Sequence, residues 1–250
     1  MSAHNEGQNI LLFLDSDHGT IINNTPSDVI YTLNFNTGSN MENYGISLES
    51  VHLPNAVYPI NSNNNKLYLS ENSGATLTIT IPPNNYDGDE IASELQTQLN
   101  AVGTLTYSVS YDVQSKKLTA SVNLPDTFGF VEGSNDIYRE LGFGTLNGQV
   151  SSYVADYPLN LSGTQYVDLQ ADISSHNYSS NGKSNILERI PIDSSFGSIV
   201  YYQNSTSDYV ALSEDSINTL EIRLLDDRGL LWELPRNAQV SMVLKLTKFV

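Results

Sequence analysis

The C-terminal segment of the chain, residues 220–249, constrains the fold more than any other part of the sequence. Leu220, Ile222 and Leu224 alternate with charged residues, and the same alternation returns over residues 238–246. A period of two is typical of a strand that buries one face and leaves the other in water. Strands of this kind favour an antiparallel sandwich over a parallel sheet that is covered by helices.

Two groups of turn residues divide this C-terminal segment into strands. Residues 226–229, with the sequence Asp-Asp-Arg-Gly, have the chemistry of a tight turn, and residues 235–237 interrupt the pattern again. The segment between them contains Trp232, the single tryptophan of the chain. The expected strands are therefore 220–225, 230–234 and a long closing strand at 238–246.

Alternating apolar residues and turn residues predict strands in the rest of the chain as well. The expected strands are 10–14, 29–35, 44–53, 66–69, 75–81, 107–113, 118–122, 165–173, 186–190 and 198–202. Residues 144–163 are rich in Gly, Ser and Asn, and we interpret them as a long loop.

One segment has the pattern of an amphipathic helix. Ile91, Leu95 and Leu99 recur at a spacing that places them on one face of a helix. Asp87, followed three residues later by a glutamate, matches a capping box at the helix start. A second, shorter helix is expected at 136–141, because a glycine that suits a helix end follows it.

With about a dozen strands and two short helices, the sequence predicts an all-β fold. An eight-stranded jelly roll would leave both helices and several strands over, and this surplus lies between residues 63 and 149. We therefore expect a jelly-roll β-sandwich whose core is formed by residues 1–62 and 150–250. Residues 63–149 would form a small inserted subdomain of strands and helices.

The charge of the chain excludes several kinds of partner. The 250 residues include 11 Lys and Arg against 28 Asp and Glu, which gives a net charge of −17. Such a charge repels nucleic-acid phosphates and anionic membrane surfaces, so we expect no nucleic-acid partner. No apolar run is long enough to span a bilayer, so we expect no membrane insertion. Residues 1–8 are polar and have no basic n-region, so we expect no signal peptide. The absence of cysteine excludes disulfides and thiolate sites and favours a reducing compartment.

The spacing of the histidines and carboxylates in this sequence is typical neither of a catalytic site nor of a metal site. No metal-binding motif contains any of the four histidines, which are His4, His18, His52 and His176. The acidic run 15–18 lacks the glycine and glutamate of a calcium loop, and helix capping explains the acidic run 86–90. We therefore predict no enzyme activity and no catalytic, cofactor-binding or metal-binding residue.

Two further patterns concern asparagine and tyrosine. We interpret the N-x-S/T sequons as coincidence in a chain rich in Asn and Ser; they lie at Asn23, Asn160, Asn177 and Asn204. Tyrosine suits interfaces because it joins an apolar ring to a polar group, although sheet formation explains any single one. The tyrosines that crowd the C-terminal half are Tyr153, Tyr157, Tyr166, Tyr178, Tyr201, Tyr202 and Tyr209.

Short motifs are spread along most of the chain. They are Leu14-Asp15-Ser16, Pro26-Ser27-Asp28-Val29, Leu53-Pro54-Asn55-Ala56-Val57-Tyr58-Pro59-Ile60, Asn65-Lys66-Leu67-Tyr68-Leu69, Asn85-Tyr86-Asp87, Tyr107-Ser108-Val109-Ser110-Tyr111-Asp112, Leu141-Gly142-Phe143, Leu187-Glu188-Arg189-Ile190-Pro191-Ile192 and Leu224-Leu225-Asp226-Asp227-Arg228-Gly229. Their order resembles the penton, or minor capsid, proteins of the jelly-roll-capsid double-stranded DNA viruses and their virophage relatives.

The resemblance implies a structural protein of the virion. A penton forms homopentamers that close the fivefold vertices of an icosahedral capsid. Its partners would be other copies of itself and a double-jelly-roll major capsid protein, with a host receptor left open as a further partner. The protein would be made in the host cell cytoplasm and located at the capsid vertex.

The residues alone leave other functions open. A receptor- or carbohydrate-binding β-sandwich, such as a viral fibre head, is the alternative. A glycan-active enzyme would need a carboxylate pair whose spacing is spatial and cannot be seen in a sequence. Oligomeric state separates the classes, because a penton is expected to be a pentamer and a fibre head a trimer.

Overall fold

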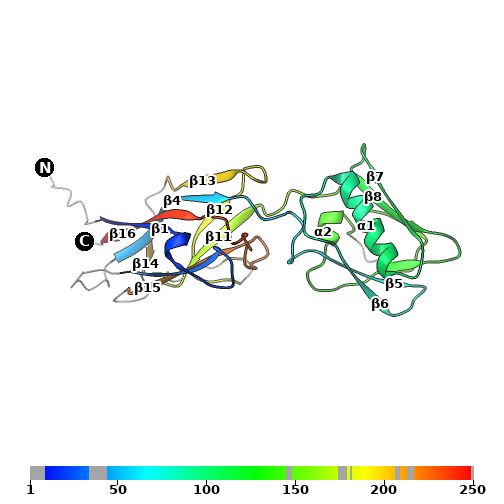
Figure 1. Ribbon diagram of the computed structural model, residues 1–250, viewed down its shortest axis with the longest axis horizontal. Coiled ribbons are helices and arrows are strands. Elements are labelled where there is room, and N and C mark those ends of the chain that lie inside the picture. The colour runs from blue at the N-terminus through cyan, green and yellow to red at the C-terminus, as the bar shows by residue number, and fades with distance from the viewer. Residues whose placement is uncertain are drawn as a thin grey trace. The chain divides into compact units, whose positions relative to one another are not determined.

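The computed structural model divides the chain into two compact units. One consists of Met1–Val57 together with Thr164–Val250, and we call it the sandwich unit; the other, Tyr58–Gly163, is the inserted unit. Figure 1 shows the elements of both units. The residues that the structure describes are 9–33, 44–144, 148–173, 179–180, 182–205, 209–212 and 217–248.

The sandwich unit contains two antiparallel sheets. The first has the order β1 (Asn9–Asp15), β16 (Ser241–Lys248), β4 (Tyr44–Pro54) and β13 (Ile199–Gln203), with β14 (Val210–Ala211) also paired to β4. The second has the order β12 (Ile186–Pro191), β11 (Tyr166–Ala171), β15 (Thr219–Leu225), β3 (Asp28–Thr32) and β2 (Thr20–Ile21). A 3-10 turn, Ser16–His18, follows β1.

The pairing of the longer strands is nested. Along the chain, the first strand pairs with the last (β1 with β16), and the second with the second-last (β3 with β15). In the same way β4 pairs with β13, and β11 pairs with β12. Nested antiparallel pairs distributed over two sheets are the topology of a jelly roll. The expected all-β jelly-roll fold is therefore confirmed.

Alternation along the strands places one side chain in two inside the sandwich. On β1, Leu12 and Leu14 are buried, whereas Leu11 and Phe13 are exposed on the outward face. Trp232 is buried in the core that the two sheets enclose, with 1% of its surface exposed. Its position makes the fluorescence of the single tryptophan a probe of the sandwich unit.

The expected strand at 230–234 is wrong. Within the described part of this segment only Leu231 pairs, in an isolated bridge to the end of β15. The Ser27 hydroxyl donates a hydrogen bond to the Trp232 carbonyl oxygen, and the Thr25 hydroxyl donates to the carbonyl two residues further on at 2.9 Å. These side-chain hydroxyls thus donate to carbonyl oxygens that would otherwise accept hydrogen bonds from a neighbouring strand.

The inserted unit contains two small sheets and both helices. One sheet has the order β6 (Thr76–Thr80), β5 (Lys66–Glu71) and β9 (Phe128–Phe130). The other has the order β10 (Ser152–Val154), β8 (Lys117–Val122) and β7 (Tyr107–Asp112). The helices are α1 (Gly88–Val102) and α2 (Tyr138–Leu141). These elements enclose a second apolar core, separate from that of the sandwich unit. In the part of the chain that the structure describes, neither helix has the length and hydropathy needed to cross a bilayer.

The structure confirms the helix that the apolar spacing predicted. Asp87 and Glu90 form the expected capping box, in which each side chain accepts a hydrogen bond from the backbone N–H of the other residue. Ile91, Leu95 and Leu99 are buried on the face that contacts β6 and β7. The shorter helix, α2, ends at a left-handed glycine as expected.

The structure differs from the expected elements in the 144–163 segment. This segment contains β10, which pairs with β8 and buries Tyr153 in the core of the inserted unit. The later boundary between the units therefore lies after Gly163 rather than at residue 149. Three other strands escaped prediction because two or three residues show no period; they are β2, β9 and β14.

Two expected strands need smaller adjustments. The closing strand begins at Ser241 instead of 238, because Ala238 N–H donates to the Pro235 carbonyl oxygen at 2.8 Å in a turn. Of the expected strand 29–35, residues 34 and 35 lie outside the described residues.

Candidate functional site

The acidic run 15–18 has a structural role in the sandwich unit. Asp15 caps the 3-10 turn by accepting a hydrogen bond from Asp17 N–H at 3.0 Å. Ser16 is fully buried, and its hydroxyl oxygen accepts from Val240 N–H at 3.0 Å. Among the residues that the structure describes, no group of three His, Cys, Asp or Glu side chains is placed to hold a metal ion.

The remaining histidines and sequons have ordinary surroundings where the structure describes them. The His52 ring packs against that of Tyr201 at a tilt of 40°, with ring centroids 4.7 Å apart. Asn23 donates to Asp28, and Asn204 donates to Glu188. His4, His176, Asn177 and Tyr178 lie outside the described residues.

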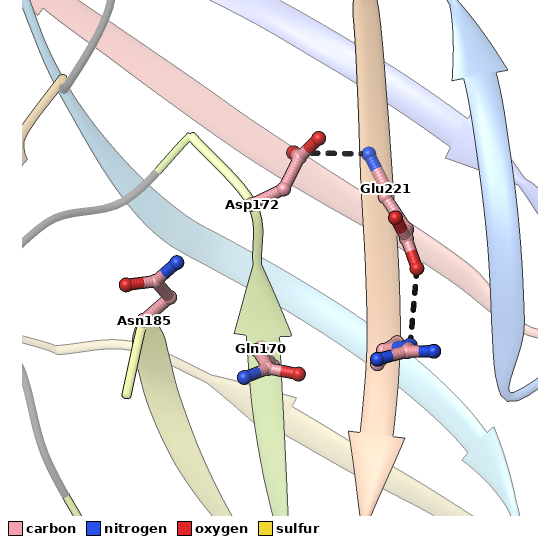
Figure 2. A pocket seen from close by; sticks show the side chains of 5 residues that line it. Gln170, Asp172, Asn185 and Glu221 are labelled. Carbon is pink, nitrogen blue, oxygen red and sulfur yellow. Dashed lines mark hydrogen bonds and ion pairs between the residues drawn. The ribbon is translucent and has the colours of Figure 1, made fainter. Parts of the chain in front are cut away.

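The outward face of the second sheet carries a group of charged and polar side chains. Figure 2 shows a pocket there, with Gln170 on β11, Asn185 to one side of it and Glu221 on the neighbouring strand β15. The Asp172 carboxylate accepts a hydrogen bond from Glu221 N–H at 3.0 Å. The Glu221 carboxylate lies 3.0 Å from the guanidinium of Arg223. The carboxylates are therefore engaged within the sheet, which explains why this pocket offers no free acid cluster.

Two buried carboxylates anchor arginines on the same face. Asp168 is 1% exposed, and the Arg189 guanidinium binds both its oxygens at 2.7 and 2.9 Å while lying 3.8 Å above the Tyr166 ring. The hydrogen bond to Asp168 raises the pKa of Arg189. Asp28 is fully buried and lies 3.5 Å from Arg223. Buried charges need such partners, so these pairs maintain the sheet and are less suited to chemistry.

The outward face of the first sheet is apolar at both of its edges. On the edge strand β1, Leu11 is 48% exposed and Phe13 is 76% exposed. On the opposite edge strand, β13, Ile199 is 66% and Tyr201 is 56% exposed. We call these the β1 patch (Leu11 and Phe13) and the β13 patch (Ile199 and Tyr201). Large apolar side chains exposed in groups mark interaction surfaces.

Sequence reasoning identified Tyr201 within the tyrosine-rich half and allowed the strand at 10–14 to pair on a sheet edge or on a neighbouring subunit. It did not predict that Leu11 and Phe13 are exposed. The signal was present in residues 10–14, where five apolar residues follow one another. A half-buried strand needs apolar residues at alternate positions only. An unbroken apolar run at a sheet edge therefore indicates that the outward face is also apolar.

A half-buried carboxylate joins the end of α1 to β5 in the inserted unit. Glu71 accepts hydrogen bonds from Thr104 N–H at 3.0 Å, Leu105 N–H at 3.3 Å and the Tyr107 hydroxyl at 3.0 Å. Partial burial acts to raise the pKa of Glu71, but these hydrogen bonds outweigh it and hold the pKa below its usual value. Burial, together with the hydrogen bond to the Glu71 carboxylate, raises the pKa of Tyr107, so its hydroxyl remains the donor.

A Glu71→Gln variant is expected to lose stability at neutral pH and less at acid pH. A carboxylate whose pKa is lowered by folding stabilises the protein above the unfolded value of 4.5, and this contribution disappears as the pH falls through the folded value. Loss of the charged acceptor should cost about 1–2 kcal/mol at pH 7. Thermal melts from pH 7 to about pH 3 would show the difference from the wild type closing.

The exposed Glu132 provides the matched control for this substitution. Glu132→Gln should change the melting temperature little at any pH, because exposed side chains contribute within about 0.5 kcal/mol. A Glu71→Gln deficit that stays constant across the pH range would contradict the assignment of Glu71 as a charged acceptor.

Comparison with known proteins identifies the fold. Neither a protein-family model nor a curated protein matches the sequence. The mavirus penton protein matches in structure with a TM-score of 0.52 and 12% identity, over 97% of this chain and 100% of that chain. This chain has the fold of the mavirus penton protein. A chain in the cryo-EM structure of the Sputnik virophage matches with a TM-score of 0.41 and 12% identity, over 95% of this chain and 98% of that chain.

The penton fold covers both units of this chain. Because the match to the mavirus penton protein spans 97% of the chain, it includes the jelly roll and the insertion between β4 and β11. The structural match agrees with the family that the sequence motifs resemble.

Proposed function

We propose that this chain is a penton, a structural subunit that forms homopentamers and closes the fivefold vertices of an icosahedral capsid. The observation that carries the proposal is the match to the mavirus penton protein over the whole of that chain. The role is structural rather than catalytic, since the polar groups of the sandwich unit are engaged in ion pairs and hydrogen bonds that maintain its sheets.

The two exposed apolar patches support assembly into a ring. In a ring, each subunit contacts its neighbours through two different surfaces, one for each side. The β1 patch and the β13 patch lie on opposite edges of one sheet, so one can face the preceding subunit and the other the following subunit. Burial of Phe13 and Ile199 removes apolar surface from water and stabilises the contact.

The penton proposal also specifies the surroundings of the protein. Its neighbours in the shell would be copies of a double-jelly-roll major capsid protein, and its location the capsid vertex after synthesis in the host cell cytoplasm. The net charge of −17 disfavours a role in binding the genome.

The native mass of the purified protein tests the proposal directly. We expect a species of five times the subunit mass of 27.5 kDa in native mass spectrometry or sedimentation. The measurement should include about 0.5 M sodium chloride, because screening weakens the repulsion between acidic subunits. A stable trimer would favour a fibre head instead. If the protein is monomeric, its absence from the vertices of purified capsids would overturn the proposal.

A further inference from the structure

The inserted unit contains a cleft that joins aromatic, charged and polar side chains. It has a volume of about 500 Å³ and lies between α2 and residues 157–160. Pockets that bind small molecules have volumes of about 300–1,000 Å³ and join an apolar surface to a few polar groups. Tyr157, Arg139, Asp136 and Asn160 are the side chains with chemistry suited to a ligand.

Tyr157 presents an aromatic ring that is exposed and yet held in place. Its side chain is 64% exposed. The ring lies against the backbone of Gly144, where an added Cβ would come within 2.2 Å of the ring atom Cε2. Tyr157 N–H also donates to the carbonyl oxygen of Gly142 at 2.9 Å. A side chain at Gly144 would displace the ring, and a Cβ at Gly142 would come within 2.2 Å of the Tyr157 carbonyl oxygen. Both glycines therefore preserve the position of this exposed tyrosine.

The polar groups of the cleft are oriented by the fold. The backbone N–H of Asn160 donates to the Glu140 carbonyl oxygen of α2 at 2.8 Å. Its side-chain oxygen accepts hydrogen bonds from the Ser162 hydroxyl at 2.6 Å and from the Ser162 N–H at 3.2 Å, and these two bonds hold the amide in place. Arg139 is exposed and adds planar donors, while Asp136 adds acceptors.

We propose that this cleft is a binding site for a neutral saccharide. One face of a pyranose ring consists of C–H groups, which pack on the negative face of an aromatic ring. The hydroxyls at the ring edge both donate and accept, and they match an amide, a guanidinium and a carboxylate placed around the aromatic ring. The lining contains one cation, Arg139, and one anion, Asp136, and so has no net charge, which favours a neutral sugar over an acidic one.

Saturation-transfer NMR on the full-length protein tests the site. The probes are the methyl glycosides of glucose, galactose, mannose and N-acetylglucosamine, each at about 1 mM, where weak single-sugar binding is visible. We expect at least one of them to show transfer that is strongest at the C–H protons of one ring face. Tyr157→Ala should weaken that binding at least about tenfold, whereas Tyr157→Phe should retain it because stacking is preserved.

Two further variants separate binding from folding. Arg139→Gln should weaken the same sugar severalfold without removing the aromatic ring. Tyr209→Ala removes a 49% exposed tyrosine of the sandwich unit and should leave binding unchanged. Absence of transfer to all four probes, or equal transfer to the wild type and Tyr157→Ala, would overturn the proposal. Neither result depends on the oligomeric state, so the penton proposal stands or falls separately.

Discussion

A Phe13→Asp variant is expected to fold as a stable subunit and to fail to form the proposed pentamer. Phe13 is 76% exposed in the isolated chain, so the substitution should change the free energy of unfolding by no more than about 0.5 kcal/mol. In the ring the same position would place an unpaired carboxylate in an apolar contact, which costs several kcal/mol. The dissociation constant should rise at least about 100-fold.

The control for Phe13→Asp introduces the same charge in the other unit. Leu124 is 81% exposed in the inserted unit, and Leu124→Asp should leave the pentamer intact. Sedimentation over a range of protein concentrations measures the assembly, and a thermal melt verifies the fold. Ile199→Asp, in the β13 patch, should break the ring as Phe13→Asp does. A Phe13→Asp pentamer as stable as the wild type would exclude β1 from the subunit contact.

Leu95→Ala is expected to destabilise the inserted unit by about 2–5 kcal/mol, the range for truncating a buried leucine. Leu95 has no exposed surface and lies between Ile91 and Leu99 on the face of α1 that packs against β6 and β7. Truncation removes apolar contacts and leaves a cavity that the surrounding strands cannot fill. A cost in this range is a large share of the stability of a domain of this size.

Two optical signals allow the effect to be assigned to one unit. Both helices lie in the inserted unit, so circular dichroism at 222 nm follows its unfolding. Fluorescence of Trp232 follows the sandwich unit. Leu95→Ala should lower the denaturation midpoint of the helical signal. Val102→Ala, at a position on α1 that is 43% exposed, should hardly move it. An unchanged helical midpoint for Leu95→Ala would show that α1 does not hold this core together.

The sequence predicted those parts of the fold that depend on neighbouring residues. Alternation over residues 220–225 and the stripe from Ile91 to Leu99 each specify one buried face, and local capping at Asp87 fixes where the helix begins. The jelly-roll class followed from many such strands with few helices. These signals are strong because each one lies within a single element.

Features that depend on distant residues could not be predicted in the same way. Residues 230–234 alternate like a strand, but Ser27 and Thr25, about 200 positions earlier, take up their carbonyl groups. The candidate cleft depends on the contact between Gly144 and the ring of Tyr157. No spacing rule connects such pairs, because the fold alone brings them together.

The insertion begins and ends at adjacent points of the inserted unit. An added Cβ on Gly163, its last residue, would lie 3.5 Å from the Cα of Pro59, next to its first residue. A segment whose ends meet can be exchanged for another at little cost in loop-closure entropy. Evolution could thus replace this whole segment by another while every strand of the jelly roll keeps its register. Foreign domains with neighbouring termini could be grafted at the same junction.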